Sequence, residues 1–175
     1  MGNPGEQYKN TRHNVGFMAL DKFAEENSFP EFSLQKKSEA LVSEKDNILL
    51  AKPQTFMNES GKAAAKLVKN VSLENLVVIH DDIDLPVGKM KIVKERGSAG
   101  HKGVESIIKA IGNDNLIRIR IGIAPQNDVK AKEIVLKNFS KEEQEEINKI
   151  ILKTAEAIGL LRDQGLEKAM NEYNK

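Results

Sequence analysis

The chain has 175 residues, enough for one well-buried core and too few for two ordinary domains, so we expect a single domain over residues 1–175. Hydrophobic residues make up 39% and charged residues 30%, the balance of a globular protein. The absence of cysteine excludes disulfides and thiolate catalysis. No apolar run approaches the roughly 18 residues of a membrane span, and the first residues lack a secretory pattern, so we expect a cytoplasmic protein without a membrane partner.

The net charge of +1 conceals an uneven distribution along the chain. Residues 1–88 carry a net charge of −3, residues 89–140 one of +6, and residues 141–175 one of −2. A basic middle segment between acidic flanks is the usual footprint of a protein that binds a polyanion. A solvated lysine-rich surface explains the pattern equally well, so charge alone does not decide between the two.

Apolar residues recur with helical and strand periods that alternate along the chain. In chain order they predict a helix over 14–27, strands over 39–43 and 47–52, a helix over 59–70, strands over 76–80 and 90–94, a helix over 102–111, a strand over 118–123, a long helix from the capping box of Ser140 and Glu143, and a short helix over 165–173. Interleaved strands and helices indicate an α/β fold with a mixed, mostly parallel, twisted sheet flanked by helices.

Two of the predicted strands differ in their expected burial. LVVIH (76–80) is apolar until its last residue and predicts a central strand that is buried on both faces. RIRIGI (118–123) alternates, with Arg118 and Arg120 on one face and isoleucines on the other. It therefore predicts a strand that is half exposed.

The three histidines all lie in or beside predicted loops. His13 precedes the first helix, His80 closes the strand LVVIH, and His101 lies in the glycine-rich loop GSAGHKG (97–103). In open α/β folds, ligands bind at the carboxyl ends of strands, so we expect His80 and the acidic run after it to border a cleft. A lone histidine in a loop is more often a surface residue than a catalyst, but three in loops rich in Gly, Asn and Asp favour a functional site.

Three carboxylates follow His80, namely Asp81, Asp82 and Asp84. Clustered hard oxygens suit Mg²⁺, which is one interpretation. In another, a buried carboxylate fixes the tautomer of an imidazole and raises its basicity. The plainest interpretation is a capped turn before Pro86, which we expect for Asp82 and leave open for Asp84.

Asparagines recur at predicted turns: Asn3 in GNPG, Asn14 in TRHN and Asn58 in TFMN. A side-chain amide offers an acceptor and two donors, so it can hold a peptide group or orient a water molecule. For Asn14 we expect the plainer role of a helix N-cap. The loop over 97–103 has neither P-loop nor GxGxxG spacing, although its backbone could approach a phosphate or a peptide closely.

Six motifs resemble, in order and spacing, those of the bacterial peptidyl-tRNA hydrolases. They are GNPG (2–5) with Tyr8, TRHNVG (11–16), PQTFMNESG (53–61), HDDIDLPVGKMK (80–91), GSAGHKG (97–103) and RIRIGI (118–123). The resemblance covers essentially the whole chain, and the combination of TRHN, TFMN and HDDIDLP is highly specific. It implies the fold of that family and hydrolysis of the ester between a stranded peptide and its tRNA, by a monomer without metal, cofactor or obligate protein partner.

The resemblance also implies the roles of individual residues. His13 would be the general base that activates water, and Asp81 would stabilise the imidazolium that forms. Asn3 would recognise the peptide and reject free aminoacyl ends. Donors to the developing oxyanion are expected from the Asn58 amide or from backbone N–H groups over 100–103.

Further residues are implied to surround this centre. Tyr8, Phe56 and Asn58 would line the site of the acylated 3′ end, and Met57 would pack against the histidine. His101 belongs to the same loop as Lys102. Basic side chains over 89–137 would bind tRNA phosphates, and those expected to do so include Lys102, Arg118 and Arg120.

The sequence departs from the family pattern in two places. Lys102 stands where the family commonly has Asn, so any role that needs an acceptor there is in doubt, and the loop over 97–103 is one glycine short. The family also has an apolar strand before GNPG, where only Met1 precedes it here. We expect Met1 to mark a truncated or misassigned start, with the first strand of the sheet incomplete.

Two alternatives come from other classes of protein. One is an RNA-binding relative that kept the fold and lost the chemistry, which Lys102 favours slightly and the intact His13 and Asp81 disfavour. The other is a metal-dependent nuclease built on HDDID (80–84), disfavoured because no second cluster of metal ligands is evident in the sequence.

Overall fold

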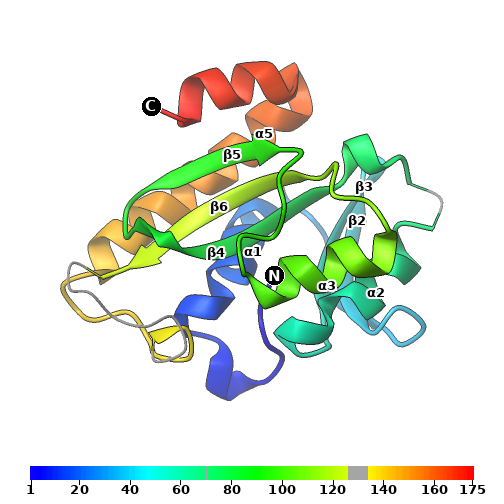
Figure 1. The fold of residues 1–175 in the computed structure, drawn as a ribbon, viewed down its shortest axis with the longest axis horizontal. Helices are drawn as coiled ribbons and strands as arrows, with labels where there is room; N and C mark the ends of the chain where they lie inside the picture. The colour runs from blue at the N-terminus through cyan, green and yellow to red at the C-terminus, as the bar shows by residue number, and fades with distance from the viewer. Residues whose placement is uncertain (70, 126–133) are drawn as a thin grey trace.

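Helices and strands alternate in the order that the apolar periodicity predicts. The computed structural model describes residues 1–69, 71–125 and 134–175 (Figure 1). The α-helices are α1 (Val15–Glu26), α2 (Ser60–Leu67), α3 (Lys102–Ile111) and α5 (Gln144–Tyr173). The strands are β1 (Ser33–Gln35), β2 (Ala40–Lys45), β3 (Ile48–Pro53), β4 (Val77–Pro86), β5 (Met90–Lys94) and β6 (Ile117–Ala124). Short 3-10 turns are η1 (Glu6–Tyr8), η2 (Arg12–Asn14), η3 (Met57–Glu59) and η4 (Leu73–Asn75).

The strands form two sheets of three strands each. In the larger sheet the order is β4-β6-β5, with β4 parallel and β5 antiparallel to β6. In the smaller sheet β1, β2 and β3 pair antiparallel in sequence order. The predicted mixed sheet is confirmed, but it is not mostly parallel: among the described strands β4 and β6 pair in parallel and the other pairs are antiparallel. β1 was not predicted, because its three residues are all exposed and carry no apolar alternation.

Helices cover both faces of the larger sheet. Figure 1 shows α1 and α5 behind the sheet, with α3 in front of it and next to α2. Successive side chains of a strand point to opposite faces, and accordingly Ile79 belongs to the core cluster of α1 and α5, whereas Val78 belongs to that of α2 and α3. Among the described helices, none combines the length and apolarity needed to cross a membrane.

The strand β6 occupies the centre of the larger sheet, a place that the sequence assigned to LVVIH. The prediction that RIRIGI is half exposed is wrong, because every residue of β6 is buried or half-buried and Arg118 is 2% exposed. Pairing on both edges, α5 on one face and the backbone of Arg96 and Gly97 on the other remove β6 from water. Its alternating arginines therefore line a polar part of the interior rather than a solvent face.

The strand β4 is longer than predicted and does not end at His80. Parallel pairing with β6 continues through Asp81 and Asp82, and an irregularity follows before Pro86 pairs with Ala124. The site carboxylate is therefore delivered from within a strand. Gly122 permits this close pairing, because a Cβ at that position would collide with the carbonyl oxygen of Pro86.

The last helix begins and breaks where the local signals indicate. Ser140 and Glu143 make the two reciprocal hydrogen bonds of a capping box, Ser140 N–H to Glu143 Oε2 at 2.8 Å and Glu143 N–H to Ser140 Oγ at 3.3 Å. The regular helix then starts at Gln144, one turn later than predicted. Gly165, with φ of 83°, interrupts the helix and separates its last segment, as the sequence predicts.

Candidate active site

The carboxylate of Asp81 lies at the centre of a cluster of three side chains. Its Oδ1 is 2.8 Å from Nδ1 of His13 and 2.9 Å from Nε2 of His101. Asp81 is 2% exposed, and burial alone would raise its pKa. The hydrogen bonds from His101 and His13 outweigh burial and hold that pKa well below its ordinary value, so Asp81 is a carboxylate at neutral pH.

The tautomers of both histidines follow from their partners. His101 is the N-cap residue of α3, and its Nδ1 accepts a hydrogen bond from the Val104 N–H at 3.2 Å. Its proton must therefore be on Nε2, which donates to Asp81. A carboxylate only accepts, so His13 donates from Nδ1, and in the neutral imidazole this places the lone pair on Nε2. The geometry thus leaves Nε2 of His13, whose side chain is 15% exposed, available as a base.

The backbone around His13 is held from two sides. The His13 N–H donates to the carbonyl oxygen of Val135 at 2.9 Å. The preceding residue, Arg12, is 5% exposed and donates to both carboxylate oxygens of Glu143 and to the carbonyl oxygen of Ile123. Sequence reasoning assigned Arg12 no role, although the TRHN motif contains it. These bonds fix the turn η2 and with it the direction of the imidazole.

Asn3 is fixed by two neighbours, and its Nδ2 has no hydrogen-bond acceptor among the described residues. Its backbone N–H donates to Oδ1 of Asn14 at 2.8 Å, and its carbonyl oxygen accepts from Nδ2 of Asn14 at 2.9 Å. Its own Oδ1 accepts from the Met57 N–H at 2.8 Å. With the oxygen of its amide committed, Asn3 can offer only its Nδ2 hydrogens to a substrate, so it is suited to bind a carbonyl oxygen.

The predicted N-cap role of Asn14 is wrong. Asn14 precedes α1, but within the described chain its side chain makes no capping hydrogen bond to that helix. It is 3% exposed, and its amide is saturated by the backbone of Asn3. A buried amide takes whichever partner satisfies both its donor and its acceptor, and here the neighbouring chain satisfies both.

The residues Phe56, Met57 and Asn58 lie partly at the rim and partly in the core. Phe56 is 54% exposed, and its ring meets the ring of Tyr8 edge to face, with centroids 6.4 Å apart. Met57 is 4% exposed in the core cluster of α2 and α3, where its sulfur adjoins Gly103. Its predicted packing against His13 stays a prediction.

A groove lies along the helices α2 and α3. It has a volume of about 540 Å³, and its lining includes Asn58, Lys102 and Lys109. Lys102 is the first residue of α3, and its exposed ammonium group pairs with Glu105 at 3.2 Å. The structure therefore places Asn58 and Lys102 on one groove, with Lys102 directly after His101.

The two arginines of β6 differ in their surroundings. Arg120 pairs with Asp82, and its side chain is 17% exposed. Asp82 also accepts the N–H of Asp84 at 2.9 Å, which confirms the predicted turn-capping role of Asp82. Arg118 is buried and donates to backbone carbonyl groups, so the expectation that it reaches tRNA phosphates is wrong for this conformation.

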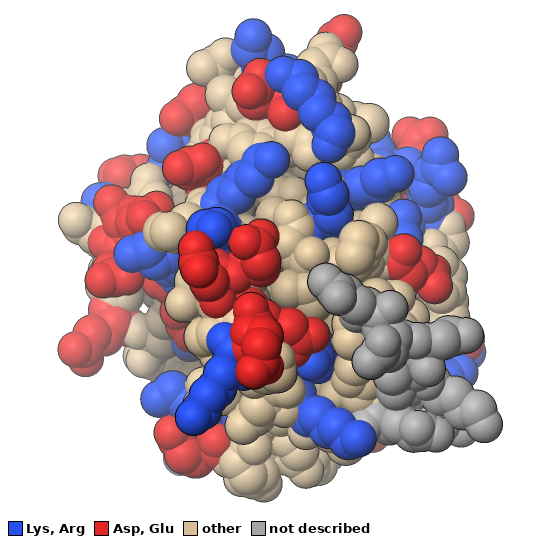
Figure 2. Space-filling model, turned by 90° about the vertical axis from the view of Figure 1, so that its left-hand side faces the viewer, with Lys and Arg blue, Asp and Glu red and all other residues tan. Residues whose placement is uncertain are grey.

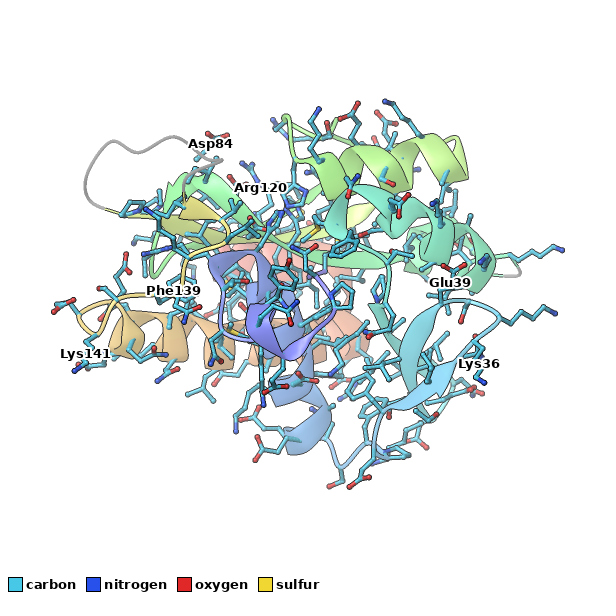
Figure 3. All side chains as sticks on the ribbon, turned by 90° about the horizontal axis from the view of Figure 1, so that it is seen from below. Lys36, Glu39, Asp84, Arg120, Phe139 and Lys141 are labelled. Carbon is cyan, nitrogen blue, oxygen red and sulfur yellow. The ribbon has the colours of Figure 1, made fainter. Side chains whose placement is uncertain are left out.

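The predicted positive face is not evident on the side shown in Figure 2, where acidic and basic side chains alternate. In Figure 3, Lys36 and Lys141 project outward at opposite ends of the molecule, whereas Arg120 lies near its middle. Lys130 and Lys132, which contribute to the predicted basic segment, lie outside the described residues.

The donor atoms of His13, Asp81 and His101 lie within 4.8 Å of one another, close enough to bind one metal ion. The hydrogen bond of His101 to α3 does not fit such a role. A neutral imidazole that binds a metal through Nε2 carries its proton on Nδ1. In His101 that N–H would face the Val104 N–H, so two donors would meet and the hydrogen bond would be lost. The described residues of this cluster are therefore arranged for hydrogen bonding to a carboxylate.

The fold is α/β, and its candidate site holds a histidine hydrogen-bonded to a buried carboxylate. Comparison with known proteins extends this description. The family model described as peptidyl-tRNA hydrolase matches residues 1–175. The chain belongs to the peptidyl-tRNA hydrolase family.

Relatives and solved structures agree with the family assignment. The chain is 45% identical over 175 residues to the peptidyl-tRNA hydrolase of Fervidobacterium nodosum, covering 99% of this chain and 93% of that protein. It is 43% identical over 181 residues to that of Thermodesulfovibrio yellowstonii, covering 100% and 96%. The crystal structure of the enzyme from Acinetobacter baumannii superposes with a TM-score of 0.91 at 28% identity, covering 99% and 91% of the two chains.

Proposed function

We propose that His13 activates the water molecule with which this hydrolase cleaves the ester of peptidyl-tRNA. The observation that carries the proposal is the 2.8 Å hydrogen bond between His13 Nδ1 and Asp81, which makes Nε2 the basic nitrogen of the neutral imidazole. Family membership supports the reaction class, because the family model spans residues 1–175.

The reaction needs one base and no covalent intermediate. An ester has a good leaving group, so attack by activated water suffices. Nε2 of His13 takes a proton from the water as its oxygen attacks the ester carbonyl, a contribution of about 10²–10⁴-fold to the rate. The Asp81 carboxylate stabilises the imidazolium formed in this step. The proton then passes to the departing ribose oxygen, and the peptide acid and the tRNA hydroxyl are released.

The oxyanion and the peptide need hydrogen-bond donors rather than acceptors. The Nδ2 of Asn3 meets this need, because its Oδ1 is occupied by the Met57 N–H. We propose that Asn3 donates to a carbonyl oxygen of the peptide and that the exposed amide of Asn58 donates to the oxyanion. A free aminoacyl ester lacks the peptide carbonyl, which accounts for selectivity against it.

The tRNA end would bind through stacking and charge. The exposed ring of Phe56, supported edge-on by Tyr8, offers a face to the terminal base. Stacking of a base on an aromatic side chain is worth about 1–3 kcal/mol and tolerates any base. Arg120 and Lys102 remain as phosphate contacts, which carry no sequence preference and so suit an enzyme that acts on most tRNAs.

We further propose that the protein acts as a monomer in the cytoplasm, where its substrate arises during translation, and that it needs no metal or other cofactor. The capping of α3 by His101 supports the last point. Chelator should therefore leave the activity unchanged, whereas a metal-dependent nuclease would be inactivated. A non-catalytic RNA-binding relative is disfavoured by the free Nε2 of His13.

The test uses one tRNA charged in two ways. The protein is incubated with N-acetylated aminoacyl-tRNA and with the same aminoacyl-tRNA carrying a free amino group, and release of deacylated tRNA is measured. We expect cleavage of the blocked form alone. Equal cleavage of both forms would refute the selectivity assigned to Asn3, and cleavage of neither, with binding of both, would favour the RNA-binding alternative.

A further inference from the structure

Arg118 lies in the middle of β6 and has an unusual set of partners. It is 2% exposed, and no carboxylate among the described residues lies within ion-pair distance of it. Its Nη2 donates to the carbonyl oxygens of Arg96 at 3.1 Å and Gly97 at 3.0 Å, and its Nε has no partner in the described chain. Burying a guanidinium without a carboxylate is costly, so these contacts to the backbone are what hold Arg118 in place.

The guanidinium also faces a buried histidine. Nη1 of Arg118 is 3.5 Å from Nε2 of His80, and Nδ1 of His80 is 2.7 Å from the carbonyl oxygen of Asp81. A carbonyl only accepts, so the proton of His80 is on Nδ1 and its Nε2 faces the guanidinium as an acceptor. Burial lowers the pKa of His80 well below its ordinary value, and His80 is therefore neutral.

Both sets of contacts lead to Asp81. Through His80, Arg118 supports the peptide group of Asp81. Through Arg96 and Gly97, it fixes the start of the segment over 96–101, which ends at His101. His101 in turn donates to the Asp81 carboxylate, and its ring packs against that of His80 with centroids 4.7 Å apart. Arg118 thus holds both His80 and the segment over 96–101, and each of these supports Asp81.

We propose that Arg118 is a positioning residue of the active site, which holds His80 and the segment over 96–101 so that Asp81 presents its carboxylate to His13. Arg118 acts through these residues and touches no reacting atom. The proposal rests on the proposed role of His13 as the base. Arg118 was expected to bind a tRNA phosphate. In this proposal it instead affects the catalytic step, by holding the residues that position Asp81.

Loss of positioning and loss of charge shift the pKa of His13 in opposite directions. A displaced Asp81 stabilises the imidazolium less and lowers that pKa, whereas removal of a nearby positive charge raises it. The titratable groups that face Asp81 include His101, which is neutral while its Nδ1 accepts from the Val104 N–H, and the Met1 amino group, whose pKa burial lowers to about 5. Arg118→Lys keeps the positive charge but loses the planar guanidinium with its several N–H donors. It therefore isolates the effect of positioning from the effect of charge.

The experiment compares Arg118→Lys and Arg118→Met with a control, Ala157→Gly, which truncates a fully buried side chain in the middle of α5. The His13 imidazole is titrated by NMR in the free protein, and single-turnover hydrolysis of N-acetylated aminoacyl-tRNA is measured across pH. For Arg118→Lys we expect the midpoint of the His13 NMR titration to move to lower pH, because a displaced Asp81 stabilises the imidazolium less. We expect the maximal hydrolysis rate to fall about 10- to 100-fold, with binding of the tRNA within about twofold of the native protein.

Several outcomes would overturn the proposal. If Arg118→Lys weakens tRNA binding and leaves the maximal rate unchanged, Arg118 is a phosphate contact. If its titration and rate match those of Ala157→Gly, its role is only structural. Should Arg118→Met fail to fold, His80→Leu provides a second route, because it removes the same support of Asp81 and must also lower the pKa of His13. The titration requires no hydrolysis, so it tests Arg118 even if the proposed reaction fails.

Discussion

The side-chain amide of Asn14 binds the backbone of Asn3 through both its donor and its acceptor. The two hydrogen bonds are 2.8 and 2.9 Å long and are buried. They mimic the pairing of a neighbouring strand and leave the side chain of Asn3 to be oriented by the Met57 N–H. The asparagine that contacts substrate in the proposed function is therefore placed by a second asparagine from another turn.

Replacing Asn14 by Asp tests this relationship with almost no change in shape. The carboxylate still accepts the Asn3 N–H but faces the Asn3 carbonyl with an oxygen instead of a donor. We expect kcat/KM on blocked aminoacyl-tRNA to fall about 10- to 100-fold through displacement of Asn3. The free energy of unfolding should fall by about 1–3 kcal/mol because a buried acceptor loses its partner. Asn148→Asp, at an exposed position of α5, is the control; equal activity of the two variants would contradict this role.

His101 has two separable functions, capping α3 and binding Asp81. Asn is a good N-cap and Ala is a poor one, and neither reaches Asp81 as the imidazole does. We expect His101→Ala to be less stable than His101→Asn by about 0.5–2 kcal/mol in denaturant unfolding. Both should lose hydrolytic rate to a similar extent. Similar stability of the two variants would show that the cap contributes little.

His80 makes the stability depend on pH. Its folded pKa lies well below its unfolded value, so it contributes stability that is present above the unfolded pKa and is lost as the pH falls through the folded one. Between about pH 6.5 and pH 5, the free energy of unfolding should therefore fall more steeply for the native chain than for His80→Leu, by up to about 1.4 kcal/mol per pH unit. Parallel curves for the two proteins in urea unfolding would show that His80 is protonated in the folded state.

Arg120 and Lys102 should each contribute to the salt dependence of tRNA binding. Arg120→Ala removes a side chain that reaches the surface, so it should weaken binding of every tRNA and flatten the salt dependence of log K by about one unit. Lys102→Ala should act in the same direction. Arg162→Ala, on the surface of α5, serves as the control. An unchanged slope in both Arg120→Ala and Lys102→Ala would place the tRNA elsewhere.

The fold was predictable wherever a local pattern had one physical meaning. The helix over 102–111 was predicted to the residue, because its apolar stripe is regular and Gly112 ends it in the left-handed conformation. The capping box at Ser140 and the helix break at Gly165 were likewise predicted from residues that are neighbours in the sequence. Such signals depend only on neighbours in the sequence.

Burial and hydrogen-bond partners were not predictable in the same way. Alternation in RIRIGI indicates two unlike faces, but the Arg118 face of β6 is covered by the backbone of Arg96 and Gly97, so Arg118 is interior. Asn14 was predicted to be a helix cap from its position before the helix. Its actual partner, Asn3, comes near it only in the tertiary fold. The pairing of His101 with Asp81 joins residues 20 apart, and no spacing rule connects them.

The central claim is that His13 is the base, and its most direct test is a single-turnover measurement. His13→Ala and the native protein are mixed in excess with N-acetylated aminoacyl-tRNA, and both cleavage and binding are followed from about pH 5 to pH 9. The native rate should fall on the acid side with an apparent pKa in the histidine range of about 6–7. His13→Ala should bind the tRNA normally and cleave it at least about 100-fold more slowly. Near-native cleavage by His13→Ala with the same acid limb would contradict the claim and assign the base to another group.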